Sequence, residues 1–79
     1  MGVRVTTIVN RDFEPTENDE KVLRVLKERA ANPLHIREET DLPKQRVNDS
    51  LERLTSAGWV RKVTRGLYEL VEDPREDHD

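Results

Sequence analysis

The sequence predicts a small α+β domain in which three helices precede a C-terminal β-hairpin. Apolar residues recur at helical spacing up to residue 57 and in alternation afterwards. Gly58 separates the two patterns, and Gly66 stands where a tight hairpin would turn. Because only 33% of the 79 residues are hydrophobic, the chain can bury one small core and no second domain.

Composition divides the chain into three parts. Residues 1–15 contain the β-branched run VRVTTIV and are predicted to form an N-terminal strand or flexible arm. Residues 16–71 carry the helical and alternating patterns and are predicted to form the folded domain. Residues 72–79, EDPREDHD, offer almost nothing apolar and are predicted to be a disordered acidic tail.

The first helix is predicted over residues 17–31. Thr16 is a suitable N-cap, and Asp19 three residues later completes an imperfect capping box. Apolar residues follow at helical spacing from Val22 to Ala30, and the proline at position 33 ends the helix.

A short helix over about 35–40 and a longer helix over about 43–57 are predicted next. The sequence DLP between them suits a turn, and Pro43 suits the first turn of a helix because its missing N–H needs no partner there. Gly58 is the expected left-handed stop. The apolar stripe of the longer helix consists of Val47, Leu51, Leu54 and Ala57.

The hairpin is predicted from strands at about 59–63 and 67–71. Thr64, Arg65 and Gly66 join the strands, and the glycine supplies the positive φ that a tight turn needs. The residues expected to face inward are Trp59, Val60, Leu67 and Leu70.

This order of short helix, turn, longer helix and hairpin is the layout of a winged helix-turn-helix. Such a domain places the longer helix in the major groove of DNA and the hairpin, or wing, against the backbone or minor groove. A reading helix needs amides and cations near its start, because Gln and Asn pair with adenine and Lys and Arg pair with guanine. An ordinary solvated helix face carries similar residues. The candidates in this helix are Lys44, Gln45, Arg46, Asn48 and, farther along, Arg53.

The charge distribution supports the same surface although the net charge is −3. Residues 42–71 carry six basic and three acidic side chains, whereas residues 72–79 carry one basic and five acidic ones. Arg61, Lys62 and Arg65 surround the hairpin tip, where phosphate contacts would supply non-specific affinity. The alternative is that these cations protect a hairpin edge from aggregation.

Two carboxylates argue against the hypothesis that this helix binds DNA. Asp49 and Glu52 lie on the predicted reading face, where an acid can accept from cytosine but repels phosphate. Arg46 and Arg53 lie about one turn from Asp49, so ion pairs within the helix could mask its charge.

Several classes of function are excluded or disfavoured. The absence of cysteine excludes a disulfide scaffold, thiol chemistry and a cysteine-ligated zinc finger. The chain has no glycine-rich phosphate loop and no paired histidines, so we expect no enzyme activity, no cofactor and no metal. His35 precedes Glu38 and Glu39, but it lacks the two-histidine spacing of a zinc helix. No small-molecule ligand is evident.

No apolar run exceeds two residues, so we expect no membrane span, no signal core and a cytoplasmic protein. Ten arginines against four lysines, with abundant acids, indicate a salt-adapted proteome rather than an ordinary acidic regulator.

The residues also carry a resemblance. The pattern I-x-x-x-T-x-L-x-x-x-x-V-x-x-x-L-x-x-L-x-x-x-G-W-V, from Ile36 to Val60, resembles winged helix-turn-helix transcriptional regulators of archaea and bacteria. The ending R-G-L-Y-E-L looks like the wing of archaeal phage-repressor-like regulators. The resemblance covers residues 18–71, and Pro43 departs from it where such regulators often carry Ser or Thr. It implies DNA contacts from Lys44, Gln45, Arg46, Asn48 and Arg65.

We therefore expect a sequence-specific double-stranded DNA-binding transcriptional regulator, with a repressor role favoured. The competing hypothesis is a winged-helix protein–protein interaction module that does not bind DNA. A homodimer is expected through the first helix, the N-terminal strand or both, because one winged helix reads about one half-site.

Overall fold

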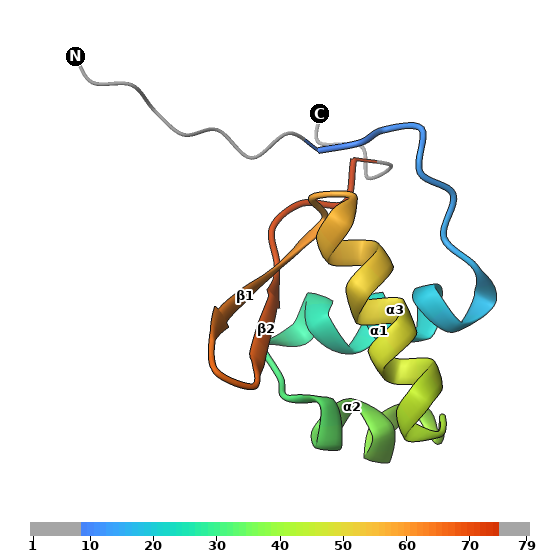
Figure 1. Ribbon diagram of the computed structural model, residues 1–79, viewed down its shortest axis with the longest axis vertical. Helices are drawn as coiled ribbons and strands as arrows, with labels where there is room; N and C mark the ends of the chain where they lie inside the picture. The colour runs from blue at the N-terminus through green and yellow to red at the C-terminus, as the bar shows by residue number, and fades with distance from the viewer. Residues whose placement is uncertain (1–8, 75–79) are drawn as a thin grey trace.

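The computed structural model describes residues 9–74, and within them three helices precede a two-stranded antiparallel sheet (Figure 1). The helices are α1 (Glu17–Glu28), α2 (Pro33–Thr40) and α3 (Lys44–Ser56). The strands are β1 (Val60–Thr64) and β2 (Leu67–Leu70). The predicted α+β class and the layout of three helices plus a C-terminal hairpin are confirmed.

Helix α1 begins as predicted and ends three residues early. The Thr16 hydroxyl accepts the Asp19 backbone N–H at 3.2 Å, and the Asp19 carboxylate accepts the Thr16 N–H at 3.0 Å, so the capping box is complete. The prediction that the helix reaches residue 31 is wrong. Arg29 is extended, and Ala31 exchanges two backbone hydrogen bonds of 2.9 Å with Tyr68. Pairing with the hairpin therefore replaces the last helical turn.

The ends of α2 and α3 are set by Asn32, Asp41 and Pro43. The Asn32 side chain accepts the His35 N–H at 2.8 Å, so α2 begins at Pro33, two residues before the predicted start. Asp41 ends α2 in the left-handed region at φ 64°. Pro43 is the N-cap of α3 and not its first residue, because its ψ of 158° is extended.

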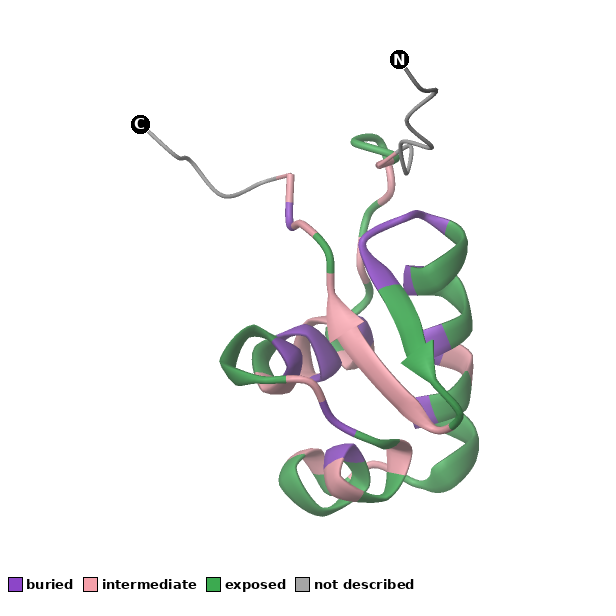
Figure 2. Ribbon diagram, turned by 90° about the vertical axis from the view of Figure 1, so that its left-hand side faces the viewer, coloured by how far each residue is buried: buried purple, intermediate pink, exposed green. Residues whose placement is uncertain are grey.

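The core lies between the three helices and the hairpin (Figure 2). Helices α1 and α3 each direct one stripe into it, and α2 contributes Ile36. Complete burial of an aliphatic or aromatic side chain contributes about 1.5–3 kcal/mol before the cost in conformational entropy. Leu67 and Leu70, predicted to face inward, are only half-buried. The fully or nearly fully buried residues include Val22, Leu23, Leu26, Ile36, Val47, Leu51, Leu54, Trp59 and Val60.

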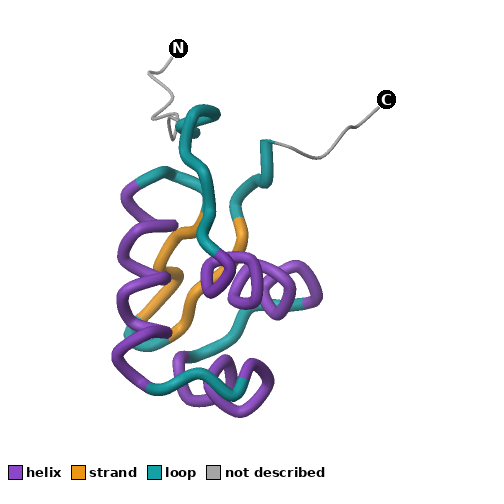
Figure 3. Tube along the Cα trace, turned by 90° about the vertical axis from the view of Figure 1, so that its right-hand side faces the viewer, coloured by secondary structure: helices purple, strands orange, loops and turns teal. Residues whose placement is uncertain are grey.

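The segment that precedes α1 runs past the end of α3 and the hairpin (Figure 3), and its Val9 and Phe13 pack against the core that contains Trp59. The indole of Trp59 is completely buried and donates its Nε1–H to the Asn10 carbonyl at 2.8 Å. The ring of Phe13 packs edge to face against the same indole, with ring centroids 5.3 Å apart. The backbone N–H of Asn10 donates to the Ala57 carbonyl at 2.8 Å. The predicted strand or arm falls mostly on residues 1–8, which lie outside the described residues, and residues 9–15 contain no strand.

The chain after β2 stays on the domain through residue 73. The N–H groups of Val71 and Glu72 donate to the Trp59 carbonyl at 2.7 and 3.3 Å. Asp73 is 3% exposed and pairs with Lys27 at 3.4 Å. The first residues of the predicted acidic tail are thus anchored, while residues 75–79 lie outside the described part.

Candidate nucleic-acid interface

The first two turns of α3 present the predicted reading residues to solvent. Lys44, Gln45, Arg46 and Asn48 are all exposed, while Val47 between them is completely buried. None of these four exposed side chains has a hydrogen bond or ion pair with another residue in 9–74. Their amides and cations are therefore available to an external partner.

The hairpin and α3 diverge from the point where α3 ends, and the hairpin turn and the start of α3 both lie in the lower half of Figure 1, on its left and right sides. Gly66 has a φ of 76° at this turn, which glycine adopts without strain. Arg65 beside it is exposed and, within 9–74, has no side-chain partner. The wing tip and the predicted reading helix thus present their cations in the same half of the fold.

The register of the hairpin places the other two predicted cations, Arg61 and Lys62, on opposite faces of the hairpin. Lys62 pairs with Tyr68 across the strands, and Arg61 pairs with Glu69. Because successive strand residues point to opposite faces, the two pairs lie on opposite sides of the hairpin. Arg61 also donates from its Nε to the Glu69 carboxylate, so its charge is compensated within the hairpin.

A groove of about 380 Å³ lies between α3 and the hairpin. It brings Asn48 from α3 together with Lys62 from β1, as expected for a helix and wing that act on one ligand. Thr55 and Tyr68 also line it, and sequence reasoning missed both. The hairpin register would have placed Tyr68 beside Lys62, and Thr55 follows Asn48 by two helical turns.

Of the two opposing carboxylates, Glu52 lines this groove, whereas Asp49 lies beside Arg53 on the other flank of α3. Glu52 is exposed and lines the groove, and Asp49 is half-buried. The ion pairs expected to mask Asp49 are not formed within residues 9–74, because Arg53 is held by another carboxylate and Arg46 has no partner there. The charge of Asp49 still acts on Arg53, because it helps to raise the pKa of that guanidinium.

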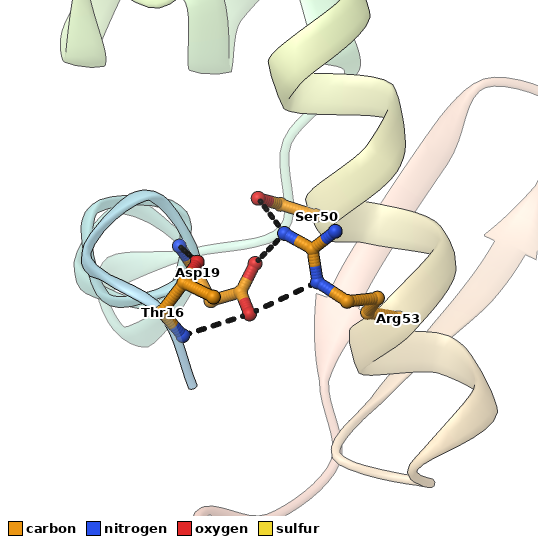
Figure 4. A network of polar contacts seen from close by, with 4 residues as sticks. All are labelled: Thr16, Asp19, Ser50 and Arg53. Atoms are coloured by element: carbon orange, nitrogen blue, oxygen red, sulfur yellow. Dashed lines mark hydrogen bonds and ion pairs between the residues drawn. The ribbon is translucent and has the colours of Figure 1, made fainter. Parts of the chain in front are cut away.

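The carboxylate that holds Arg53 is Asp19, at the start of α1 (Figure 4). Arg53 Nη2 lies 2.8 Å from Asp19 Oδ1, and Arg53 Nε lies 3.3 Å from Oδ2. The same Nη2 lies 3.4 Å from the Ser50 hydroxyl oxygen. The Asp19 side chain is completely buried, whereas the Arg53 side chain is 44% exposed. The pair therefore joins α1 to α3 with one charge inside and the other at the surface.

Burial by itself would raise the pKa of the Asp19 carboxyl. Hydrogen bonds from Arg53, Ser50 and the Thr16 backbone outweigh that effect, and together with the charge of Arg53 they lower the pKa below its ordinary value of 3.8. The contact with Asp19 raises the pKa of Arg53 further above its already high value. Both groups therefore stay charged at neutral pH.

The eight predicted DNA-binding residues thus fall into two groups within the described structure. Arg53 and Arg61 are paired with carboxylates. The other six are exposed side chains without partners in residues 9–74: Lys44, Gln45, Arg46, Asn48, Lys62 and Arg65.

The same part of the chain contains no cluster of three or more metal-ligating side chains. None of its helices has the length and apolar character that crossing a bilayer requires.

Comparison with known proteins gives one family. The sequence model of the family described as sugar-specific transcriptional regulator TrmB matches residues 11–73, which include all three helices and the hairpin. No curated protein and no solved structure matched the chain.

Proposed function

We propose, from the premise that the chain belongs to the TrmB family of transcriptional regulators, that it binds double-stranded DNA in a sequence-specific manner and acts as a repressor. Family membership makes the chain a winged-helix, DNA-binding regulator in general terms. The base contacts, the phosphate contacts and the sign of regulation are what we add.

The observation that carries this proposal is the placement of the unpartnered cations and amides. The start of α3 and the hairpin turn lie in the same half of the fold, and a groove between α3 and the hairpin brings Asn48 together with Lys62. A major groove about 12 Å wide admits a helix such as α3, and the wing then meets the adjacent backbone.

Within this arrangement the amides read bases. Gln45 and Asn48 can each pair with both hydrogen-bonding atoms of an adenine edge, and Lys44 or Arg46 can reach guanine. Glu52, which faces the same groove, can accept from the exocyclic amine of cytosine. An acid in this position also disfavours sequences that place the acceptors of guanine beside it.

The wing contacts the backbone. Lys62, Tyr68 and Thr55 supply an ammonium and two hydroxyls to the groove between α3 and the hairpin, where a DNA strand would pass. Arg65 at the tip reaches toward a minor groove. Arg61 lies on the other side of the hairpin with Glu69, so its contribution is the weakest of the three basic wing residues.

Repression follows most simply from occupancy. A domain that covers promoter DNA excludes the transcription machinery without a further contact. Because one winged helix reads about one half-site, we also expect two copies on a paired site, joined through α1, the N-terminal segment or both. A monomer mass in sedimentation at high micromolar concentration, over a range of salt, would contradict the dimer.

Two narrower features belong to the same proposal. The R-G-L-Y-E-L wing favours the archaeal phage-repressor-like subtype, and the arginine-rich, acid-rich composition favours a salt-adapted environment. Salt adaptation predicts that the midpoint temperature of thermal unfolding is higher in molar potassium chloride than in dilute buffer.

The proposal is tested by binding to the promoter DNA beside the protein's own gene and to a scrambled duplex, over a salt series. Lys62→Ala and Arg65→Ala should weaken both and flatten the salt slope by about one unit per lost phosphate contact. Gln45→Ala and Asn48→Ala should cost about 1–3 kcal/mol on the preferred site only.

The matched control is Arg24→Ala, which removes an exposed cation of α1 that lies away from the groove and should change neither affinity. Failure of the wild-type protein to bind either duplex at low salt would exclude the DNA-binding proposal. The remaining hypothesis would then be that the domain is a protein–protein interaction module.

A further inference from the structure

Two arginines lie on the flank of α3 that faces away from the hairpin groove. Arg46 and Arg53 are seven residues apart, so helical periodicity places them on the same side, two turns from one another. Arg46 is exposed and, within 9–74, has no partner. Arg53 is held on Asp19 by two hydrogen bonds. A helix in a major groove has one DNA strand on each side, so this flank faces the strand opposite the wing.

We propose that Asp19 is a specificity-determining residue, which withholds the guanidinium of Arg53 from the DNA backbone and so keeps sequence-independent affinity low. The inference rests on the proposed DNA binding and deepens it. Arg53 then acts as a tether between α3 and α1, and Arg46 remains the available cation of this flank.

The geometry makes the pair hard to open. Asp19 is completely buried, and its Oδ2 also accepts the Thr16 N–H at 3.0 Å, so the carboxylate cannot follow Arg53 toward solvent. If Arg53 moved to a phosphate, the buried carboxylate would lose its cation. The cost of leaving a buried charge without its partner exceeds the gain from one solvent-exposed phosphate contact.

The consequence for recognition follows from what each type of contact contributes. Phosphate contacts strengthen binding to every sequence, whereas base contacts strengthen binding to the correct site. Discrimination is the difference between the two affinities, so a cation kept off the backbone lowers competition from random DNA. Asp19 achieves this without direct contact with DNA, because it acts through Arg53.

The test compares four proteins on a scrambled duplex of about 20 base pairs by fluorescence anisotropy between 50 and 200 mM salt: the wild type, Asp19→Asn, Asp19→Glu and the double variant Asp19→Asn/Arg53→Gln. The amide of Asp19→Asn can still accept the capping N–H but cannot hold a cation by charge. Arg53 is then released from Asp19, with Asp49 on α3 as its remaining acidic neighbour, and can contact phosphate, so the salt slope should steepen by up to about 0.9. The ratio of the affinity of Asp19→Asn for the scrambled duplex to that of the wild type should be about threefold larger at the low end of this salt range than at the high end.

The two other variants separate this effect from a structural one. Asp19→Glu keeps the charge and is a good capping-box residue, so it should keep the wild-type slope. The double variant lacks the released cation and should also return to the wild-type slope. Circular dichroism establishes that each protein is folded at the temperature of the binding assay.

A measurement on the wild-type protein keeps the inference falsifiable if Asp19→Asn does not fold. The side-chain Nε–H signals of Arg46 and Arg53 are followed by NMR as duplex is added. The Arg46 signal should shift and the Arg53 signal should not. An equal slope for Asp19→Asn and the wild type, or a shift of the Arg53 signal comparable to that of Arg46, overturns the inference while leaving DNA binding intact. Absence of binding by every variant overturns both.

Discussion

Arg53 and Asp19 connect the helix predicted to read DNA with the first turn of α1. They are 34 residues apart in the sequence, and Nη2 and Nε of the arginine lie 2.8 and 3.3 Å from the two carboxylate oxygens. The same carboxylate completes the capping box with Thr16. One buried side chain therefore both starts α1 and holds α3 against it.

Asp19→Asn should lower the free energy of unfolding by about 1–2 kcal/mol at neutral pH. This is less than the roughly 3–5 kcal/mol that breaking a fully buried ion pair costs, because Arg53 is 44% exposed and water can solvate it once the pair is broken. Urea unfolding of the two proteins at one temperature measures the difference.

The difference in unfolding free energy between the wild type and Asp19→Asn should decrease as the pH falls. The folded state lowers the pKa of Asp19 below its ordinary value of 3.8, so the stabilisation is complete above that value and is lost as pH falls further toward the folded-state pKa. The wild type and Asp19→Asn should therefore converge in stability below about pH 4. A difference that stays constant down to pH 2 would show that the carboxylate charge is not what stabilises the pair.

Trp59→Phe should destabilise the domain by about 1–3 kcal/mol, because it removes buried volume and leaves the Asn10 carbonyl without its indole donor. Trp59 is the single tryptophan, so native fluorescence reports its environment directly. Native emission should be blue-shifted and weakly quenched by iodide. Water-like, readily quenched emission from the folded protein would contradict the packing of Phe13 and Asn10 over the ring.

The sequence was sufficient for the parts of the fold that rest on local pattern. The apolar stripe of α3, the stop at Gly58 and the turn at Gly66 follow from spacing and backbone preference, and each lies where predicted. The end of α1 was predicted wrongly, because local spacing favours helix through Ala30 while pairing of Ala31 with Tyr68 takes the chain into the sheet.

The candidate site likewise has features that the sequence could predict and one that it could not. The position of Lys44 and Arg65 on exposed elements could be predicted from residue type and spacing. The partner of Arg53 could not, because Asp49 is the nearer carboxylate in sequence and only the packing of α1 on α3 brings Asp19 within reach. Tertiary geometry thus decided which cations remain available to a partner.

Tyr68→Phe should weaken binding to all duplexes about two- to tenfold, the value expected for loss of one hydrogen bond. The change removes a hydroxyl and keeps the ring, so the backbone bonds of Tyr68 to Ala31 and the stability of the hairpin should be retained. Anisotropy on specific and scrambled DNA gives the two affinities. A loss confined to the specific site would assign Tyr68 to base reading and not to the backbone.

Removal of residues 75–79 should tighten DNA binding, most strongly at low salt. The segment carries one arginine and three acidic residues, so its loss reduces repulsion from phosphate, and salt screens that repulsion. The truncation leaves Asp73 in its contact with Lys27, which a cut after residue 71 would destroy. Equal affinity of the two proteins at low salt would exclude an inhibitory role for the segment.

The claim that α3 and the hairpin form the DNA-binding surface is tested most directly by NMR titration of the wild-type protein with duplex DNA. Backbone amide signals should shift in the first two turns of α3, around Lys44 to Asn48, and in the hairpin from Lys62 to Leu67, with little change around Arg24 on α1. Shifts confined to the surface between α1 and α2, or no shift at low salt, would contradict the account.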